Sequence, residues 1–142
     1  MNNKVLVSFS TYNSPVFLEH LVESIEKYDA GYPFDLLILD NSSTDPRQLK
    51  ALERFAKKYR IEVKENHGRA QGGYHHAYIH NLDYPYHFFL HDDSAIIRNN
   101  WLKVGIDRIN DKSLESVIDP YNDSNVHLCR SEERRVGKEC SE

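Results

Sequence analysis

The amino-acid sequence predicts an α/β fold of three layers, with helices on both faces of a mainly parallel β-sheet. Short apolar runs alternate along the chain with segments whose apolar residues recur at helical spacing. The run 36–39 is apolar throughout, which is typical of a strand buried on both faces of a parallel sheet. Connections are short, and right-handed crossovers between parallel strands place helices on both faces of the sheet.

The first two strands and the helix between them have recognisable boundaries. Residues 5–9 form an apolar strand, and Pro15 suits the first turn of the helix that follows. The apolar spacing of this helix stops at 28–31. The second strand, at 36–39, is closed by the polar turn 40–46. Together these segments predict one complete strand–helix–strand unit.

The second helix is expected at 47–59. Four of its residues should form the apolar inner face: Leu49, Leu52, Phe55 and Ala56. The later elements are, in order, a strand at 61–63, a glycine-bearing loop at 66–73, a helix at 74–81, a strand at 87–90, a helix at 99–109 and a strand opening at 116–118. The alternation of strand and helix is therefore expected to continue beyond the first unit.

Length and composition restrict the classes of function. With 142 residues, 39% of them hydrophobic and 28% charged, the chain has the composition of one globular domain. Its net charge of −4 gives no electrostatic basis for binding nucleic acid. No apolar run approaches the roughly 20 residues of a membrane span, and no secretory signal is recognisable, so we expect a cytoplasmic protein. Cys129 and Cys140 lack the spacing of a zinc site or a disulfide framework.

The last segment of the chain differs from the rest. Residues 130–140 read RSEERRVGKEC, which has the periodicity of neither a strand nor an amphipathic helix. This segment resembles the in-frame translation of a common sequencing adapter. We therefore expect residues 1–129 to be an incomplete domain and residues 130–142 to be an artefactual or disordered tail.

Polar residues follow four of the predicted strands, at 10–13, 40–45, 66–69 and 91–94. Because the carboxyl ends of parallel strands lie at one edge of a sheet, we expect these clusters to meet near a switch in strand order, where α/β sheets bind ligands. Asp92 and Asp93 directly follow a buried strand. Adjacent carboxylates can hold a hard divalent cation such as Mg²⁺, which shares its remaining positions with water and phosphate oxygens.

Four segments carry a resemblance to a known family: VSFSTYN, LLILDNSSTD, ENHGRAQGG and FFLHDDS, in this order. Over residues 4–110 they resemble the nucleotide-binding half of a family 2 glycosyltransferase of the GT-A fold. The resemblance implies an enzyme that binds a nucleotide-diphosphate sugar with a divalent metal and transfers the sugar, with inversion, to a glycan, lipid or protein acceptor. The sequence identifies neither the nucleobase, nor the sugar, nor the acceptor.

The same resemblance implies roles for individual residues. The positions that would bind the nucleotide sugar are Thr11, Tyr12, Asn13, Asp40, Asn66, Gly68, Arg69 and Asp92. His91, Asp92 and Asp93 are similar to the family's DXD-type motif, which holds Mn²⁺ or Mg²⁺, and Asp93 is the first choice of metal ligand. His91 stands where an aspartate is common, and because an imidazole suits Mn²⁺ better than Mg²⁺, the identity of the metal stays open.

Other interpretations remain open. Asp40 is equally well explained as an Asx-turn residue that ends a strand, and Tyr12 as a packed surface aromatic. A nucleotidyltransferase would need a basic, glycine-rich loop after its first strand. A non-catalytic, Mg²⁺-binding, doubly wound interaction domain would need acidic residues there. Residues 10–13 read STYN and supply neither, which favours sugar transfer.

The general base for inversion is not recognisable in this chain. In the family it follows the metal motif, in the acceptor half of the domain, and it must reach the acceptor hydroxyl. Asp119 and Asp123 are the late carboxylates that come into question, and we expect neither to be the base. We therefore expect the chain to bind a donor weakly and to transfer sugar poorly or not at all.

Overall fold

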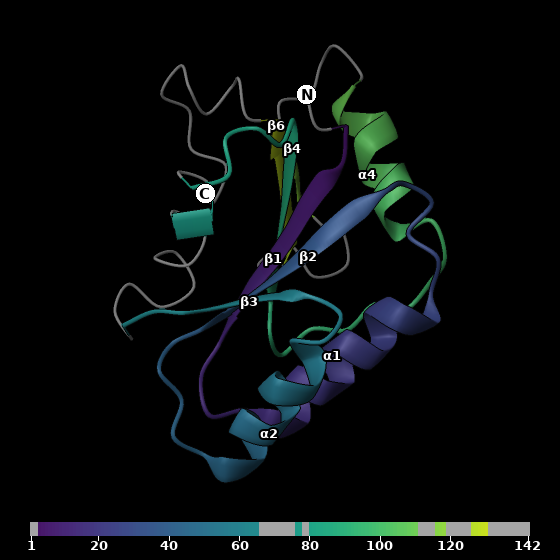
Figure 1. The fold of residues 1–142 in the computed structure, drawn as a ribbon. Helices are drawn as coiled ribbons and strands as arrows, with labels where there is room; N and C mark the ends of the chain where they lie inside the picture. The colour runs from purple at the N-terminus through teal and green to yellow at the C-terminus, as the bar shows by residue number, and fades with distance from the viewer. Residues whose placement is uncertain (1–2, 66–75, 78–79, 111–115, 119–125, 131–142) are drawn as a thin grey trace.

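The computed structural model describes residues 3–65, 76–77, 80–110, 116–118 and 126–130, which contain a six-stranded sheet in the order β3-β2-β1-β4-β6-β5 (Figure 1). The strands are β1 (Val5–Thr11), β2 (Phe34–Asp40), β3 (Arg60–Val63), β4 (Tyr86–His91), β5 (Ser116–Ile118) and β6 (Val126–Arg130). The first four are parallel, whereas β6 pairs antiparallel with β4 and with β5. The predicted mainly parallel α/β sheet is confirmed, and β6 is a strand that the sequence analysis did not identify.

Three described helices, α1 (Pro15–Lys27), α2 (Pro46–Phe55) and α4 (Trp101–Ile109), pack on one face of this sheet (Figure 1). The apolar stripe of α1 is buried along its length and ends at Ile25. Side chains of all three helices join one core cluster with the strand residues that alternate toward this face, which include Val7, Phe9, Ile38 and Leu90. This layer holds the strands of the sheet against the helices that follow them.

The inner face of α2 differs from the prediction at two positions. Leu49 is 47% exposed and Ala56 caps the helix at its exposed carboxyl end, while the polar Gln48 is fully buried. The buried residues of this helix are Gln48, Ala51, Leu52 and Phe55. Their spacing is that of a regular helical stripe, which places Leu49 one position away from the core. The helix therefore buries an amide where a leucine was expected.

The opposite face of the sheet carries a second, smaller core cluster, formed by Leu6, Leu37, Leu39, Ala77, Tyr84 and Phe89. Residues 76–77 are helical, as predicted for 74–81, but residue 80 lies in a turn and residue 81 has no regular secondary structure, so the predicted helix is wrong at its end. Residues 74, 75, 78 and 79 lie outside the described part. The loop 66–73 also lies outside it.

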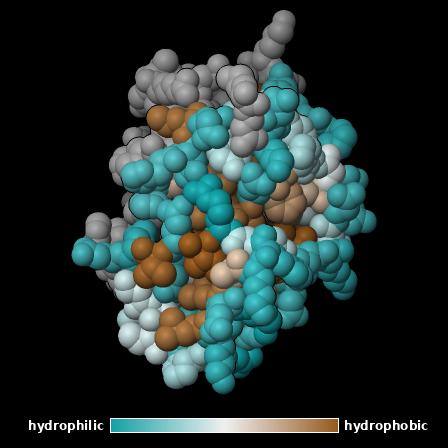
Figure 2. Space-filling view, in the orientation of Figure 1, coloured by the Kyte–Doolittle hydropathy of each residue, from teal (hydrophilic) through white to brown (hydrophobic). Residues whose placement is uncertain are grey.

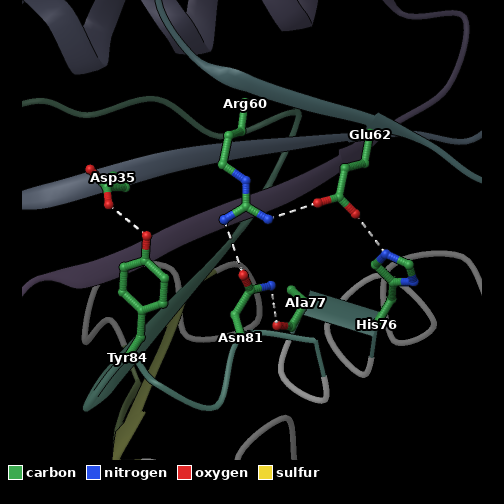
Figure 3. Close-up of polar contacts among 7 residues, drawn as sticks. All are labelled: Asp35, Arg60, Glu62, His76, Ala77, Asn81 and Tyr84. Carbon is green, nitrogen blue, oxygen red and sulfur yellow. Dashed lines mark hydrogen bonds and ion pairs between the residues drawn. The ribbon is translucent and has the colours of Figure 1, made fainter. Parts of the chain in front are cut away.

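Beside this cluster, polar contacts join the edge strand β3 to the segment 76–81 (Figure 3). Arg60 donates to Asn81 Oδ1 at 3.0 Å and forms an ion pair with Glu62 at 2.8 Å. Glu62 Oε1 lies 2.9 Å from His76 Nε2. We call Arg60, Glu62, His76 and Asn81 the edge network. It fastens His76 and Asn81 to the edge strand of the sheet.

The surface is mostly polar, and apolar side chains reach it in small groups on the face shown in Figure 2. The larger exposed apolar residues are Tyr12, Val16, Phe17, Leu49, Val63, Leu82, Ile97 and Val104. Among the described residues, no helix is both long enough and apolar enough to cross a membrane.

Candidate functional site

The candidate site lies where the strand order reverses. From β1 the chain proceeds to β2 and β3 on one side, and then returns to place β4 on the other side of β1. In the sheet register Thr11 pairs with Asp40, and Ser10 pairs with His91. Three of the four predicted polar clusters therefore meet at one edge, at the switch point where ligands of α/β sheets bind. The fourth cluster, with Asn66, Gly68 and Arg69, lies outside the described residues.

Asp40 is at this edge but is only 1% exposed. Its carboxylate accepts hydrogen bonds from the backbone N–H of Ser43 at 2.8 Å, from the Ser43 hydroxyl at 2.6 Å and from Gln48 Nε2 at 3.2 Å. A buried carboxylate with three donors is satisfied within the protein. In this structure Asp40 therefore shapes the turn after β2 instead of presenting its oxygens to a ligand, in agreement with the Asx-turn interpretation.

Asn13 holds the same turn from the other side. Its side-chain Oδ1 accepts from the backbone N–H groups of Thr44 at 2.8 Å and Asp45 at 2.9 Å. Its own backbone N–H donates to the Ser43 hydroxyl at 2.9 Å, and its φ of 45° lies in the left-handed region that asparagine tolerates. Asp45 then caps α2 by accepting from the backbone N–H of Arg47. The turn between β2 and α2 is thus fixed both by Asp40 at the end of β2 and by Asn13, which follows β1.

Thr11 connects this turn to the neighbouring strand β1. The Thr11 side chain is buried, and its Oγ1 accepts a hydrogen bond from Gln48 Nε2 at 2.9 Å. We call Asp40, Gln48 and Thr11 the site network. It joins β2, α2 and β1 through consecutive hydrogen bonds, and the pairing of Ser10 with His91 brings the end of β4 to the same edge. The predicted convergence of these strand ends is therefore confirmed.

Asp92 and Asp93 follow β4 in a tight turn, in which the His91 carbonyl accepts from the backbone N–H of Ser94 at 3.1 Å. Asp92 is partly buried, whereas Asp93 is exposed. Burial and the negative charge of Asp93 raise the pKa of Asp92. Two acids that repel each other at a sheet edge form a site whose charge a bound cation would neutralise.

The side chains at the end of β4 fit a divalent metal. Asp92 and Asp93 offer the carboxylate oxygens that Mg²⁺ and Mn²⁺ prefer, and His91 is a partly buried imidazole beside them. Over the described residues, no three or more His, Cys, Asp or Glu side chains converge as a complete metal cage. Such a pair of acids fits a metal that takes its other ligands from water and from the phosphates of a substrate.

Two residues of this edge were missed by the sequence analysis. Gln48 bridges the strand ends from α2, and only the phase of the helical stripe could have indicated it. Asn41 is 4% exposed, and its side-chain Oδ1 has no hydrogen-bond partner among the described residues. Its backbone N–H donates to the Thr11 carbonyl at 2.9 Å, which places it at the same edge. A buried, unpaired amide oxygen there is a candidate ligand contact.

The sequence profile of the family described as Glycosyl transferase family 2 matches residues 7–127. The chain belongs to glycosyl transferase family 2. No curated protein sequence matches it significantly.

Solved structures agree with the fold of this family 2 chain. Mannosyltransferase PcManGT from Pyrobaculum calidifontis, in complex with GDP-Man and Mn²⁺, is 17% identical with a TM-score of 0.73, over 96% of this chain and 47% of that one. TarS 1-349 from S. aureus in complex with UDP is 19% identical with a TM-score of 0.67, over 94% and 48%. Its complex with UDP-GlcNAc gives the same identity and TM-score, over 94% and 47%. These matches show a GT-A fold, and the chain spans about half the length of each structure.

Proposed function

We propose that this chain is the donor-binding half of a glycosyltransferase that binds a nucleotide-diphosphate sugar together with a divalent metal. The observation that carries the proposal is the convergence of the ends of β2, β1 and β4 at the switch point, where the site network joins the ends of β2 and β1. Binding of GDP-Man with Mn²⁺ by one structural neighbour and of UDP-GlcNAc by another supports this class of ligand. These two neighbours bind different nucleotide sugars, so neither the nucleobase nor the sugar of the donor is assigned here.

We assign roles according to exposure. Tyr12 is 44% exposed and offers a ring face on which a nucleobase can stack, with a hydroxyl at its tip. Asn41 has an unpaired amide oxygen for a base or ribose donor, a role that the sequence analysis gave to Asp40. Asp40 and Asn13 shape the turn between β2 and α2. Asn66, Gly68 and Arg69 keep the role in binding the nucleotide sugar that the resemblance implies.

Asp93 is the proposed principal metal ligand, with Asp92 beside it and His91 as a further ligand candidate. When bound, the metal neutralises the negative charge that develops on the leaving nucleoside diphosphate. The protein's own contribution is to place Asp92 and Asp93 at the end of β4 and to present Asp93 to solvent. The acceptor and the inverting general base belong to the part of the enzyme that this chain does not span.

Nucleotide titration tests the proposal. Isothermal titration calorimetry with UDP and GDP, each with and without MnCl₂, should show that Mn²⁺ tightens binding of one nucleotide by about tenfold or more. Asp93→Asn should abolish that tightening. The matched control Asp107→Asn removes an exposed carboxylate that pairs with Lys103 on α4, and it should leave the tightening intact.

The same titration distinguishes the competing functions. Metal binding that is indifferent to nucleotide would overturn the proposal in favour of a Mg²⁺-binding interaction domain. Release of pyrophosphate from a nucleoside triphosphate, with no hydrolysis or transfer from any nucleotide sugar, would favour a nucleotidyltransferase. Strong sugar transfer to an acceptor by this chain alone would contradict the expectation that the acceptor half is required.

A further inference from the structure

The connection from β4 to α4, residues 92–100, contains no helix or strand and begins with the two acids of the candidate site. It passes beside α1, where Figure 1 shows it as the green chain between the two elements. Such a segment has no hydrogen-bond ladder of its own, so its path depends on the bonds that it makes to neighbouring elements. These bonds therefore help to decide where the carboxylates of Asp92 and Asp93 lie.

Asp92 and Asp93 are the two central residues of a β-turn, residues 91–94, which we call the acidic turn. The His91 carbonyl accepts from the backbone N–H of Ser94 at 3.1 Å and also from the Ser94 hydroxyl. His91 is the last residue of β4 and pairs with Ser10 of β1. The sheet therefore fixes the first end of the acidic turn.

Ser24 of α1 holds the chain just beyond the other end of this turn. Its O–H donates to the Leu21 carbonyl at 2.7 Å, so the lone pairs of the Ser24 oxygen stay available. The backbone N–H of Ile96 donates to that oxygen at 2.9 Å. The Ile96 side chain also packs against the core cluster that contains the α1 stripe. Ile96 is thus attached to α1 by a hydrogen bond and by packing.

A serine at this position is not explained by the packing of α1 alone. Ser24 is 8% exposed, and the other buried residues of the helix are all apolar: Leu18, Leu21, Val22 and Ile25. A serine hydroxyl that bonds back to its own helix adds no stability to that helix, and burying the hydroxyl has a desolvation cost. The bond from Ile96 gives this hydroxyl a partner outside α1, three residues after Asp93.

We propose that Ser24 is a positioning residue, which anchors Ile96 to α1 and thereby holds the acidic turn in the arrangement that receives a divalent metal with its nucleotide. This inference rests on the proposed function. Asp92 and Asp93 repel each other, and a turn held at both ends keeps their carboxylates together before a metal arrives. Binding then requires less reorganisation of the chain, which favours affinity. Ser24 acts through the backbone of 94–96.

The experiment compares Ser24→Ala and Ser24→Thr in the full chain. The probe is UDP or GDP, whichever binds the unmodified chain more tightly, and the measured quantity is the ratio of its dissociation constants without and with MnCl₂. We call this ratio the Mn²⁺ tightening. Ser24→Ala removes the acceptor for Ile96, and the Mn²⁺ tightening should fall about fivefold, the factor that corresponds to one neutral hydrogen bond. Ser24→Thr retains a hydroxyl that can bond to the preceding helical turn, and it should restore the tightening.

A control variant separates positioning from a general loss of stability. Tyr59→Phe also removes one hydrogen bond to α1, in which the Tyr59 hydroxyl donates to Glu26 at 2.6 Å, but it leaves the connection 92–100 untouched. Urea unfolding should show that Ser24→Ala and Tyr59→Phe both lose stability, whereas only Ser24→Ala should lose Mn²⁺ tightening. The affinity of Ser24→Ala for the nucleotide without MnCl₂ should not change, because without a metal the two carboxylates do not attract a diphosphate.

Three results would overturn the inference: an unchanged Mn²⁺ tightening in Ser24→Ala, an equal loss in Tyr59→Phe, or no recovery in Ser24→Thr. If Ser24→Ala does not fold, as judged by its thermal unfolding, Ala95→Gly decides the question. Ala95 is exposed and joins the acidic turn to Ile96, so glycine loosens this link without removing a packed side chain. A reduced tightening in Ala95→Gly would then support the inference, and an unchanged one would overturn it.

The outcome also separates this inference from the proposed function. Nucleotide binding that depends on Mn²⁺ and on Asp93, with full Mn²⁺ tightening in Ser24→Ala, removes the inference and leaves the function standing. Absence of Mn²⁺-dependent binding in the unmodified chain removes both.

Discussion

Two polar networks hold the two faces of the same sheet, and they are built from different chemistry. The site network lies under α2 and joins the carboxyl group of Asp40 to the neutral side chains of Gln48 and Thr11. All three of its residues are at most 2% exposed. The edge network of Arg60, Glu62, His76 and Asn81 joins mostly charged groups (Figure 3), and the side chains of Arg60 and Glu62 are 46% and 34% exposed.

The difference shows which network fixes geometry. Buried hydrogen bonds to a charge have few competing waters, and loss of one partner leaves a group that water cannot solvate. Exposed ion pairs are screened, and their charges are solvated again when they separate. The site network is therefore suited to hold binding residues in one arrangement. The edge network is suited to fasten His76 and Asn81 to β3 by contacts whose loss costs little free energy.

The largest expected effect is the loss of stability that follows from removing the Asp40 carboxylate. Asp40→Ala leaves the Ser43 N–H, the Ser43 hydroxyl and Gln48 Nε2 without their shared acceptor, and the free energy of unfolding should fall by about 3 kcal/mol or more. Glu62→Ala removes the central carboxylate of the edge network and should cost about 1 kcal/mol or less. Urea unfolding followed by circular dichroism measures both. Equal losses would break the distinction between the networks.

The next effect concerns the turn that Asn13 supports. Asn13→Ala removes the acceptor for the N–H groups of Thr44 and Asp45 and forces a side chain with no local hydrogen bond to a φ of 45°, so stability should fall by about 2 kcal/mol. Asn13→Gly loses the same hydrogen bonds but accepts the positive φ without strain. In urea unfolding, the free energy of unfolding of Asn13→Gly should therefore exceed that of Asn13→Ala by about 1 kcal/mol. A glycine variant no more stable than the alanine variant would show that the backbone conformation contributes nothing.

Much of this architecture could be predicted because it depends on patterns that the chain carries locally. The apolar runs at β1, β2 and β4 indicated buried parallel strands, and parallel strands necessarily bring their carboxyl ends to one edge. That geometric rule was sufficient to bring Thr11, Asp40 and Asp92 together from sequence. The strand β6 was not predicted, although apolar residues alternate with polar ones in Val126–Arg130, because five residues are a short signal in a segment that adjoins the predicted tail.

The roles of residues within the site were harder to predict, because they depend on burial and not on residue type. A carboxylate that ends a strand has the same sequence signature whether it faces a ligand or accepts from its own turn, and only the three donors around Asp40 distinguish these cases. Which side chains of α2 face the core was hard to predict for a similar reason. Leucine is the better core residue, but the helix begins at Pro46 after the Asp45 cap, and this start turns Gln48 inward and Leu49 outward.

The smallest expected effect is the pH dependence of the edge network. Although burial raises the pKa of Glu62, hydrogen bonds from His76 and Arg60 outweigh it and hold that pKa below its ordinary value. A carboxyl with a lowered folded-state pKa stabilises the fold above its unfolded pKa of about 4.3, and this contribution disappears as pH falls through the folded-state pKa. The free energy of unfolding of the unmodified chain should therefore exceed that of Glu62→Gln by at most about 1 kcal/mol at pH 7, and the difference should shrink below about pH 4.3. Arg60→Met removes one of the two donors and should reduce the pH-dependent part of that difference. If the difference is the same at pH 7 and pH 3, the contacts of Glu62 in the edge network do not depend on its charge, and the contrast with the site network disappears.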